Sequence, residues 1–216
     1  MSEREPTLRE RQRSETRRVI QTHAVGLFTD RGYDAVTVAD VAAASGVSAM
    51  TVYRHFPTKE DLVLIEQPGR LIAERVAASQ ATHPLVRRVG GALIEAATAL
   101  TSDDGAPPDS PDADERFLLD SLRLMVATPA LRARHLDSQY ALQQAIVEAL
   151  GHDTDDTTDA DAAFSAHAAT SACLAAMHTA LTRWAQDNGQ TRLPDLITQA
   201  LAASFGDIAV VGVHRK

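Results

Sequence analysis

The chain has 216 residues, of which 44% are hydrophobic and 4% aromatic, and its net charge is −8. That length allows one or two domains with a real core, and the hydrophobic share is that of a globular protein. Cys173 is the only cysteine, which excludes an intramolecular disulfide and suits a reducing compartment. No apolar run approaches the ~20 residues of a membrane helix, and the N-terminus has no apolar signal core. We therefore expect a soluble cytoplasmic protein without a membrane partner.

Charge is distributed unevenly along the chain. Residues 1–61 hold nine basic and nine acidic groups, whereas the remaining residues hold twelve basic and twenty acidic ones. Positive charge is concentrated in five arginines: Arg9, Arg11, Arg13, Arg17 and Arg18. We expect residues 1–12 to be a flexible basic arm, because local charge matters more than net charge for binding phosphates. Two interpretations stay open for the arm, a solvated tail and a segment that becomes ordered along a nucleic-acid backbone.

Residues 14–31 have the apolar spacing of an amphipathic helix, and Gly32 is placed to end it. A second helix is predicted to begin after Thr37, a typical N-cap residue, with Asp40 three positions later to complete a capping box. Gly46 is suited to end that helix in a left-handed backbone conformation.

A third helix is predicted over residues 49–56. Ser48 is its N-cap, and Val52 and Phe56 lie four residues apart on its buried face. Pro57 ends it, because the residue before a proline avoids the helical region. Two helices joined by a short turn that contains glycine form a helix-turn-helix pattern.

The rest of the chain is also dominated by helical spacing. Thr58 and Asp61 form a second capping box at the start of a further helix, which Pro68 and Gly69 should bend or break. More helices are expected over residues 85–100, 116–126, 129–150, 160–187 and 194–205, with acidic loops at 103–114 and 152–159. Only residues 208–213 have the composition of a strand, and they are assigned to a tail. The expected fold class is all-α.

The segment TVADVAAASGVSAMTVYRHFPTKED, residues 37–61, and the preceding LFTDRGYDAVTV resemble the DNA-binding domain of the TetR family of bacterial transcriptional regulators. The resemblance implies a three-helix helix-turn-helix domain over residues 1–61. It also implies a helical ligand-binding and dimerisation domain over residues 62–206, followed by a tail over residues 207–216. Within that second domain, RFLLDSLRLMVATPALRARHLDSQYALQQAIVEAL is loosely similar to a subgroup that binds acyl-CoA-like ligands.

The resemblance also implies which residues contact DNA. Base edges are read from the positions that here are Ala49, Met50, Thr51, Tyr53 and Arg54. Phosphates are held from the positions matching Thr37, Tyr53, His55 and Lys59, and Ser48 lies at the same surface. Hydroxyl, imidazole and ammonium groups are all phosphate donors, which agrees with these assignments. Arg54 is the best candidate for a bidentate contact to guanine.

Departures and alternatives remain for this surface. Many family members carry Arg or Gly where this chain has Ala49 and Met50, which offer only apolar contact. The alternative readings are a Tyr53 packed against the first helix, a surface or capping His55, and a solvated Lys59.

Walls of an effector pocket are expected among large apolar side chains of the C-terminal helices, which could also be plain core: Leu93, Leu118, Leu122, Met125, Leu142, Ile146, Met177 and Trp184. Arg123 is a further candidate, because a charge within an apolar helix needs a partner. That partner could be Asp120, a surface position or an anionic ligand head. The small side chains of residues 165–181 suit close packing between helices of a two-fold dimer.

No metal, cofactor or catalytic activity is expected. His167 and His178 share a helix face but lie too far apart for one metal ion, and Cys173 lies off that face. The sequence contains no P-loop, GxSxG or HExxH motif and no Cys–His pair at suitable spacing.

The sequence therefore predicts a homodimeric regulator that binds a palindromic operator in double-stranded DNA. The leading hypothesis is a repressor that a small hydrophobic or acyl-CoA-like effector releases from the operator. The alternatives are a transcriptional activator and a helical protein-interaction adaptor with a vestigial DNA-binding domain. The retained phosphate donors argue against the adaptor.

Overall fold

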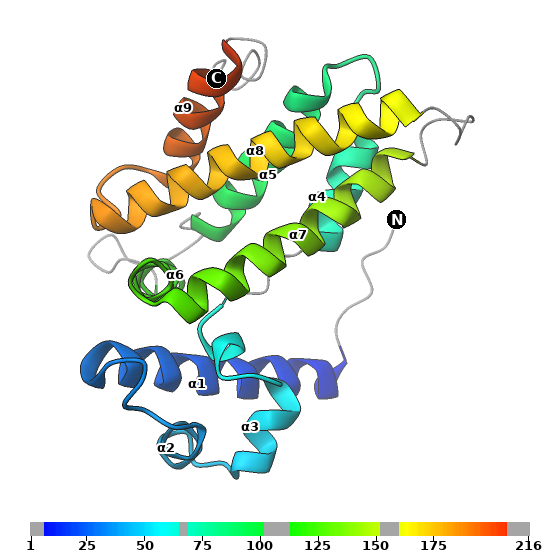
Figure 1. Cartoon of the computed structure of the whole chain (residues 1–216). Helices are drawn as coiled ribbons and strands as arrows, with labels where there is room; N and C mark the ends of the chain where they lie inside the picture. Colours follow the sequence, from blue (N-terminus) through cyan, green and yellow to red (C-terminus); the bar gives the residue numbers. More distant parts are fainter. Residues whose placement is uncertain (1–6, 65–68, 102–112, 152–159, 207–216) are drawn as a thin grey trace.

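The computed structural model describes residues 7–64, 69–101, 113–151 and 160–206. These residues form helices and turns without any strand, which confirms the all-α fold (Figure 1). None of their helices is both long enough and apolar enough to span a bilayer. Two tiers are visible: a small group of N-terminal helices and a larger bundle on which α1 is docked through α6.

The small group contains three helices and one short 3-10 turn: α1 (Leu8–Arg31), α2 (Val38–Ala44), α3 (Ala49–His55) and η1 (Glu60–Leu62). Its core is formed by fully buried side chains from each helix: Ile20, Ala24, Phe28, Val41, Val52 and Phe56. Val19, next to Ile20 on α1, is 36% exposed.

Helix α1 begins earlier than the sequence suggested. The backbone N–H of Arg11 donates to the Thr7 carbonyl at 3.0 Å, so the helix is already formed at Leu8. Leu, Arg, Glu and Gln are good helix formers, which explains why this segment continues the helix. The expectation of a flexible arm is therefore wrong for residues 8–12, and residues 1–6 lie outside the described part of the chain.

The second capping box forms, but it begins only a 3-10 turn. The Thr58 N–H donates to Asp61 Oδ2 at 3.0 Å, and the Asp61 N–H donates to Thr58 Oγ1 at 3.3 Å. The next described helix starts at Gly69, one of the two residues expected to bend or break the helix; residues 65–68 lie outside the described part of the chain.

The larger bundle contains the six remaining helices: α4 (Gly69–Ala78), α5 (Leu85–Thr101), α6 (Ala113–Ala127), α7 (Pro129–Gly151), α8 (Ala160–Gln186) and α9 (Leu193–Phe205). Helix α8 packs against α5, α6, α7 and α9, while α4 lies along α7. Gly90 brings α5 close to α9, since a Cβ there would lie 2.9 Å from Leu201 Cδ1. The expected helices of this region are all present. The acidic loop at 152–159, most of the one at 103–114 and the tail at 207–216 fall outside the described residues.

Candidate nucleic-acid interface and ligand cavity

The first helix of the helix-turn-helix is held by the capping box at its start. The Thr37 N–H donates to Asp40 Oδ2 at 2.8 Å, and the Asp40 N–H donates to Thr37 Oγ1 at 3.2 Å. The Thr37 hydroxyl also donates to Asp40 Oδ2 at 2.6 Å. These bonds, led by the hydroxyl, lower the pKa of Asp40. The Thr37 hydroxyl therefore already donates its proton to Asp40, although the Thr37 side chain is exposed to solvent.

The turn and the second helix follow the expected local pattern. Gly46 has a φ of 67°, in the left-handed region that favours glycine. Ser48 caps α3 by accepting the Thr51 N–H at 3.1 Å, and the two hydroxyls lie 2.9 Å apart. Both hydroxyls thus stabilise the start of the helix that the sequence assigned to DNA recognition.

Helix α3 has one buried and one open face. Val52 is fully buried, and Phe56, its C-cap residue, is 1% exposed. On the other side Met50 is 78% and Tyr53 50% exposed, and Arg54 is also exposed. Ala49 and Thr51 are half-buried. Within the described residues no other helix covers this outer face, and Tyr53 is not packed away against α1.

His55 is more enclosed than a simple surface contact would be. Its side chain is buried, and its Nδ1 has no hydrogen-bond partner among the described residues. Arg17 braces the position from α1: its Nη1 donates to the His55 carbonyl at 2.8 Å, and its guanidinium lies 4.3 Å from the centre of the Phe56 ring. Burial, followed by the charges of Arg54, Arg13 and Arg17, lowers the pKa of His55. The imidazole is therefore neutral at neutral pH.

Lys59 joins the segment after α3 to the turn after α1. Its Nζ donates to the Tyr33 carbonyl at 2.6 Å and lies 4.2 Å from the centre of the Tyr33 ring. The Tyr33 hydroxyl donates to Glu60 Oε1 at 3.0 Å. Lys59 is therefore not simply solvated, although an ammonium has three donors and this bond occupies one. The sequence contained no local signal for this contact, because the partners lie 26 residues apart.

A basic hollow lies between α1 and α3. Arg9 and Arg13 line it from α1, and Arg54 and His55 line it from α3. No acidic side chain is among its described lining residues. The early start of α1 thus places two arginines beside the recognition helix, where an extended arm was expected.

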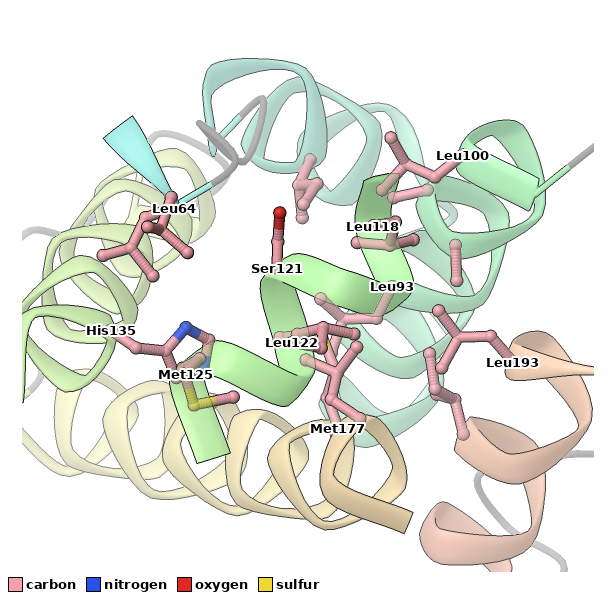
Figure 2. Close-up of a pocket in the computed structure, with 16 residues that line it drawn as sticks. Leu64, Leu93, Leu100, Leu118, Ser121, Leu122, Met125, His135, Met177 and Leu193 are labelled. Atoms are coloured by element: carbon pink, nitrogen blue, oxygen red, sulfur yellow. The ribbon is translucent and has the colours of Figure 1, made fainter. Parts of the chain in front are cut away.

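The larger bundle encloses an apolar cavity of about 80 Å³ (Figure 2). Fourteen of its sixteen described lining residues are apolar: Val63, Leu64, Ile72, Leu93, Ala96, Ala97, Leu100, Leu118, Leu122, Met125, Met177, Leu181, Leu193 and Ile197. The two polar ones are Ser121 of α6 and His135 of α7. Its lining is therefore suited to a mainly apolar molecule, and because ligand pockets usually measure ~300–1,000 Å³, an effector would have to widen the cavity.

The cavity contains five of the nine side chains that the sequence suggested as pocket walls: Leu93, Leu118, Leu122, Met125 and Met177. Leu142, Ile146 and Trp184 pack in the core without lining it. Arg123 points to the surface, where its guanidinium contacts Asp120 at 3.0 Å and donates to Asn188 Oδ1 at 2.7 Å. These two partners account for its charge, so this cavity gives no support to Arg123 as a ligand contact.

Ser121 and His135 are the polar lining residues that sequence reasoning missed. His135 is 7% exposed and its ring centre lies 5.3 Å from that of His178. Burial, followed by the neighbouring His178, lowers the pKa of His135 to about 4. No group of three metal-ligating side chains occurs within the described residues. The apolar residues Leu131 and Leu142 on the same helix were the signal that could have placed His135 on an inward face, since 131, 135 and 142 share helical spacing.

Comparisons with known proteins agree with this arrangement. Residues 20–64 match the model for bacterial regulatory proteins of the tetR family, and residues 100–204 match the model for the MftR C-terminal domain. The chain is 30% identical over 157 residues to the HTH-type transcriptional regulator TcmR of Streptomyces glaucescens, covering 70% of this chain and 67% of TcmR. The chain belongs to the TetR family. Family members are transcriptional regulators, so the protein is a regulator and not an enzyme.

Solved structures of other family members have the same fold. NalD, the secondary repressor of the MexAB-OprM multidrug efflux pump in Pseudomonas aeruginosa, is 20% identical with a TM-score of 0.55, over 90% of this chain and 96% of NalD. FadR from Bacillus subtilis in complex with stearoyl-CoA is 17% identical with a TM-score of 0.53, over 88% of this chain and 98% of FadR. At these identities the likeness establishes the TetR architecture of helix-turn-helix and helical C-terminal domain.

Proposed function

We propose that this TetR-family regulator is a homodimeric repressor that a small hydrophobic effector releases from a palindromic operator. Residues 1–61 would bind DNA, and residues 62–206 would bind the effector and the second subunit. The observation that carries the proposal is the open outer face of α3 beside the basic hollow, because both fit one stretch of duplex DNA. Arg54 would read a base, with Met50, Tyr53, Ala49 and Thr51 around it.

Backbone phosphates would be held around this face. His55 lines the hollow together with Arg9, Arg13 and Arg54, which supports a phosphate contact there. Lys59 has two further donors, and Thr37 and Ser48 present exposed helix N-termini. Arg9 and Arg13 extend the positive surface along α1.

The effector would act through the junction between the two tiers. Val63 and Leu64 line the cavity directly after η1, so the cavity wall continues the DNA-binding unit. Arg134 of α7 binds Asp61 of η1, with both Nε and Nη2 3.0 Å from Asp61 Oδ1. The next residue, His135, lines the cavity. A ligand that moves α7 would therefore move the ion pair that holds the helix-turn-helix.

Dimerisation is supported by the outer face of α8. Between residues 168 and 179 the exposed or half-exposed positions, apart from His178, are small side chains, among them Ala168, Ala172, Ala175 and Thr179. Small residues allow helices of two subunits to approach closely. A dimer would place two recognition helices on successive major grooves, ~34 Å apart.

Selection of bound sequences from random duplex DNA tests the proposal. We expect an enriched palindrome, bound by a dimer in a salt-dependent manner. A reporter placed behind that palindrome should be silenced by the protein; activation of the reporter would instead identify an activator. Failure to enrich any sequence at low salt would refute the DNA-binding function.

A further inference from the structure

The cavity of the larger bundle contains two polar atoms without protein partners. Ser121 is 4% and His135 7% exposed, and neither Ser121 Oγ nor His135 Nε2 has a hydrogen-bond partner among the described residues. An unpaired buried hydroxyl or imidazole nitrogen costs about 1–3 kcal/mol, so a bound molecule that forms a hydrogen bond with such an atom would remove that cost. Figure 2 shows both side chains projecting from α6 and α7 toward the space next to Leu64.

The cavity offers nothing that would neutralise a charged ligand. Its described lining contains no Asp, Glu, Lys or Arg. His135 is uncharged at neutral pH, because burial holds its pKa at about 4. A buried ionised group without a counter-charge is strongly unfavourable.

A neighbouring hollow does not supply the missing charge. It shares Leu64 with the cavity and is lined by Arg17, Arg70 and Arg134. Two of these arginines have acidic partners, since Arg134 binds Asp61 and Arg70 binds Glu74 at 2.7 Å, while Arg17 donates to the neutral His55 carbonyl. Asp137 also lines the hollow. An anionic head group there would therefore compete with Asp61, Glu74 and Asp137 for the arginines.

We propose that the effector is an uncharged, largely apolar molecule with a hydroxyl group that bonds to Ser121 Oγ or to His135 Nε2. A hydroxyl both donates and accepts, so it pairs with a serine hydroxyl and with either tautomer of a neutral imidazole. Ser121 and His135 are then the specificity-determining residues, and the leucine and methionine walls supply nonspecific burial. This inference rests on the proposed function, in which the cavity is the effector site.

Equilibrium dialysis of the full chain at pH 7.5 tests the inference with four probes: naphthalene, 2-naphthol, 2-naphthoate and decanoyl-CoA. We expect 2-naphthol to bind at least about fivefold more tightly than naphthalene, as one neutral hydrogen bond provides. Ser121→Ala or His135→Phe, whichever removes the partner of the hydroxyl, should remove about fivefold of the 2-naphthol affinity and leave naphthalene binding unchanged. His135→Phe keeps an aromatic ring of similar size. Met125→Leu is the matched control and should alter the affinities of both probes in equal proportion.

Four outcomes would overturn the inference: equal affinity for naphthalene and 2-naphthol, tighter binding of 2-naphthoate or decanoyl-CoA, equal loss of both neutral probes in Ser121→Ala, and no binding of any probe. Operator binding by the same samples separates this result from the proposed function. A protein that binds its selected palindrome but fails the dialysis test refutes only the ligand class. A protein that binds no DNA refutes the proposed function.

Discussion

The helix-turn-helix and the helices around the cavity satisfy their polar groups in different ways. In the first, most polar side chains near the candidate interface bond to partners a few residues away, as in the Thr37–Asp40 and Ser48–Thr51 pairs. Around the cavity, Ser121 and His135 come from different helices and have no partner within the described chain. His55 is the counterpart on the DNA side, and it borders the basic hollow.

By this difference the helix-turn-helix is a preformed surface for DNA, whereas the cavity is a site that can respond to a ligand. Locally bonded caps favour the start of α2 and of α3 independently of the larger bundle. Unpaired polar groups in an apolar cavity raise the free energy of the fold. A ligand that bonds to them removes this cost, and it thereby shifts the population towards the conformer that it binds. The following experiments test this difference between the two regions.

The largest effect is expected for Phe56→Ala. Phe56 is 1% exposed at the centre of the small tier, and its truncation should cost about 3–5 kcal/mol. We expect this variant to lose operator binding. Part of its helical circular dichroism signal should be lost at a lower temperature than in wild type, while the larger bundle still binds 2-naphthol. Tyr53→Ala is the control, because it should weaken DNA binding without a loss of stability. Simultaneous loss of probe binding in Phe56→Ala would contradict the independence of the two tiers.

Acid should destabilise the cavity region through His135. Its folded pKa of about 4 lies below the ordinary 6.5, so between these values the unfolded chain binds a proton that the folded chain does not. The free energy of unfolding should therefore fall as pH falls from about 6.5, by up to ~3 kcal/mol once pH is below about 4. No such loss is expected above pH 7.

Denaturant titrations of wild type and His135→Phe at pH 7 and pH 5 measure this contribution. The carboxylates respond to acid equally in both proteins, so the difference between the two pH dependences isolates His135. We expect the variant to lose about 2 kcal/mol less than wild type at pH 5. Parallel curves for the two proteins would show that His135 titrates normally.

Substitutions in the helix-turn-helix should distinguish a residue that reads a base from one that binds a phosphate. Arg54→Ala should cost about 1–3 kcal/mol at one operator position and relax the preference there. Lys59→Ala should weaken binding to all operator sequences alike, and it should reduce the slope of DNA affinity against salt concentration by about one. It should also lower stability, because Lys59 holds the Tyr33 carbonyl. Binding measured on operator variants at several salt concentrations distinguishes the two, and a uniform loss in both would contradict the assignment.

The same contrast explains what the sequence could predict. The ends of α2 and α3 depend on residues within four positions of one another, such as Ser48 with Thr51, so their limits were expected to within one residue. The start of α1 was wrong because an arginine-rich segment reads equally as a solvated tail and as a helix.

The cavity depends on packing between distant helices, which helical spacing does not describe. Spacing identified Ile146 and Trp184 as buried, but it could not tell which buried residues leave space between them. For Arg123 the sequence offered Asp120 as one possible partner, and that contact forms; the second partner, Asn188, lies 65 residues away and left no local signal. Ser121 was overlooked because a serine inside an apolar helix carries no signal of its own.

The smallest effect concerns the ion pair that crosses the two tiers. Burial alone would raise the pKa of Asp61, but hydrogen bonds from Thr58 and Arg134 lower it, so the carboxylate is charged at neutral pH. Because the pair is partly exposed, an Asp61→Asn and Arg134→Gln double-mutant cycle should give a coupling of about 0.5–1 kcal/mol in stability.

The functional consequence of that ion pair should be about as large as its contribution to stability. If α7 transmits ligand binding through Arg134, an effector that weakens operator binding by wild type should weaken it about two- to fivefold less in Arg134→Gln, the factor that corresponds to ~0.5–1 kcal/mol. Arg70→Gln is the matched control, since Arg70 is exposed, lines the same hollow and pairs within its own helix with Glu74. Operator titrations with and without effector measure both variants. An unchanged effector response in Arg134→Gln would place the connection elsewhere, with Val63 and Leu64 as the remaining continuous path from the cavity to η1.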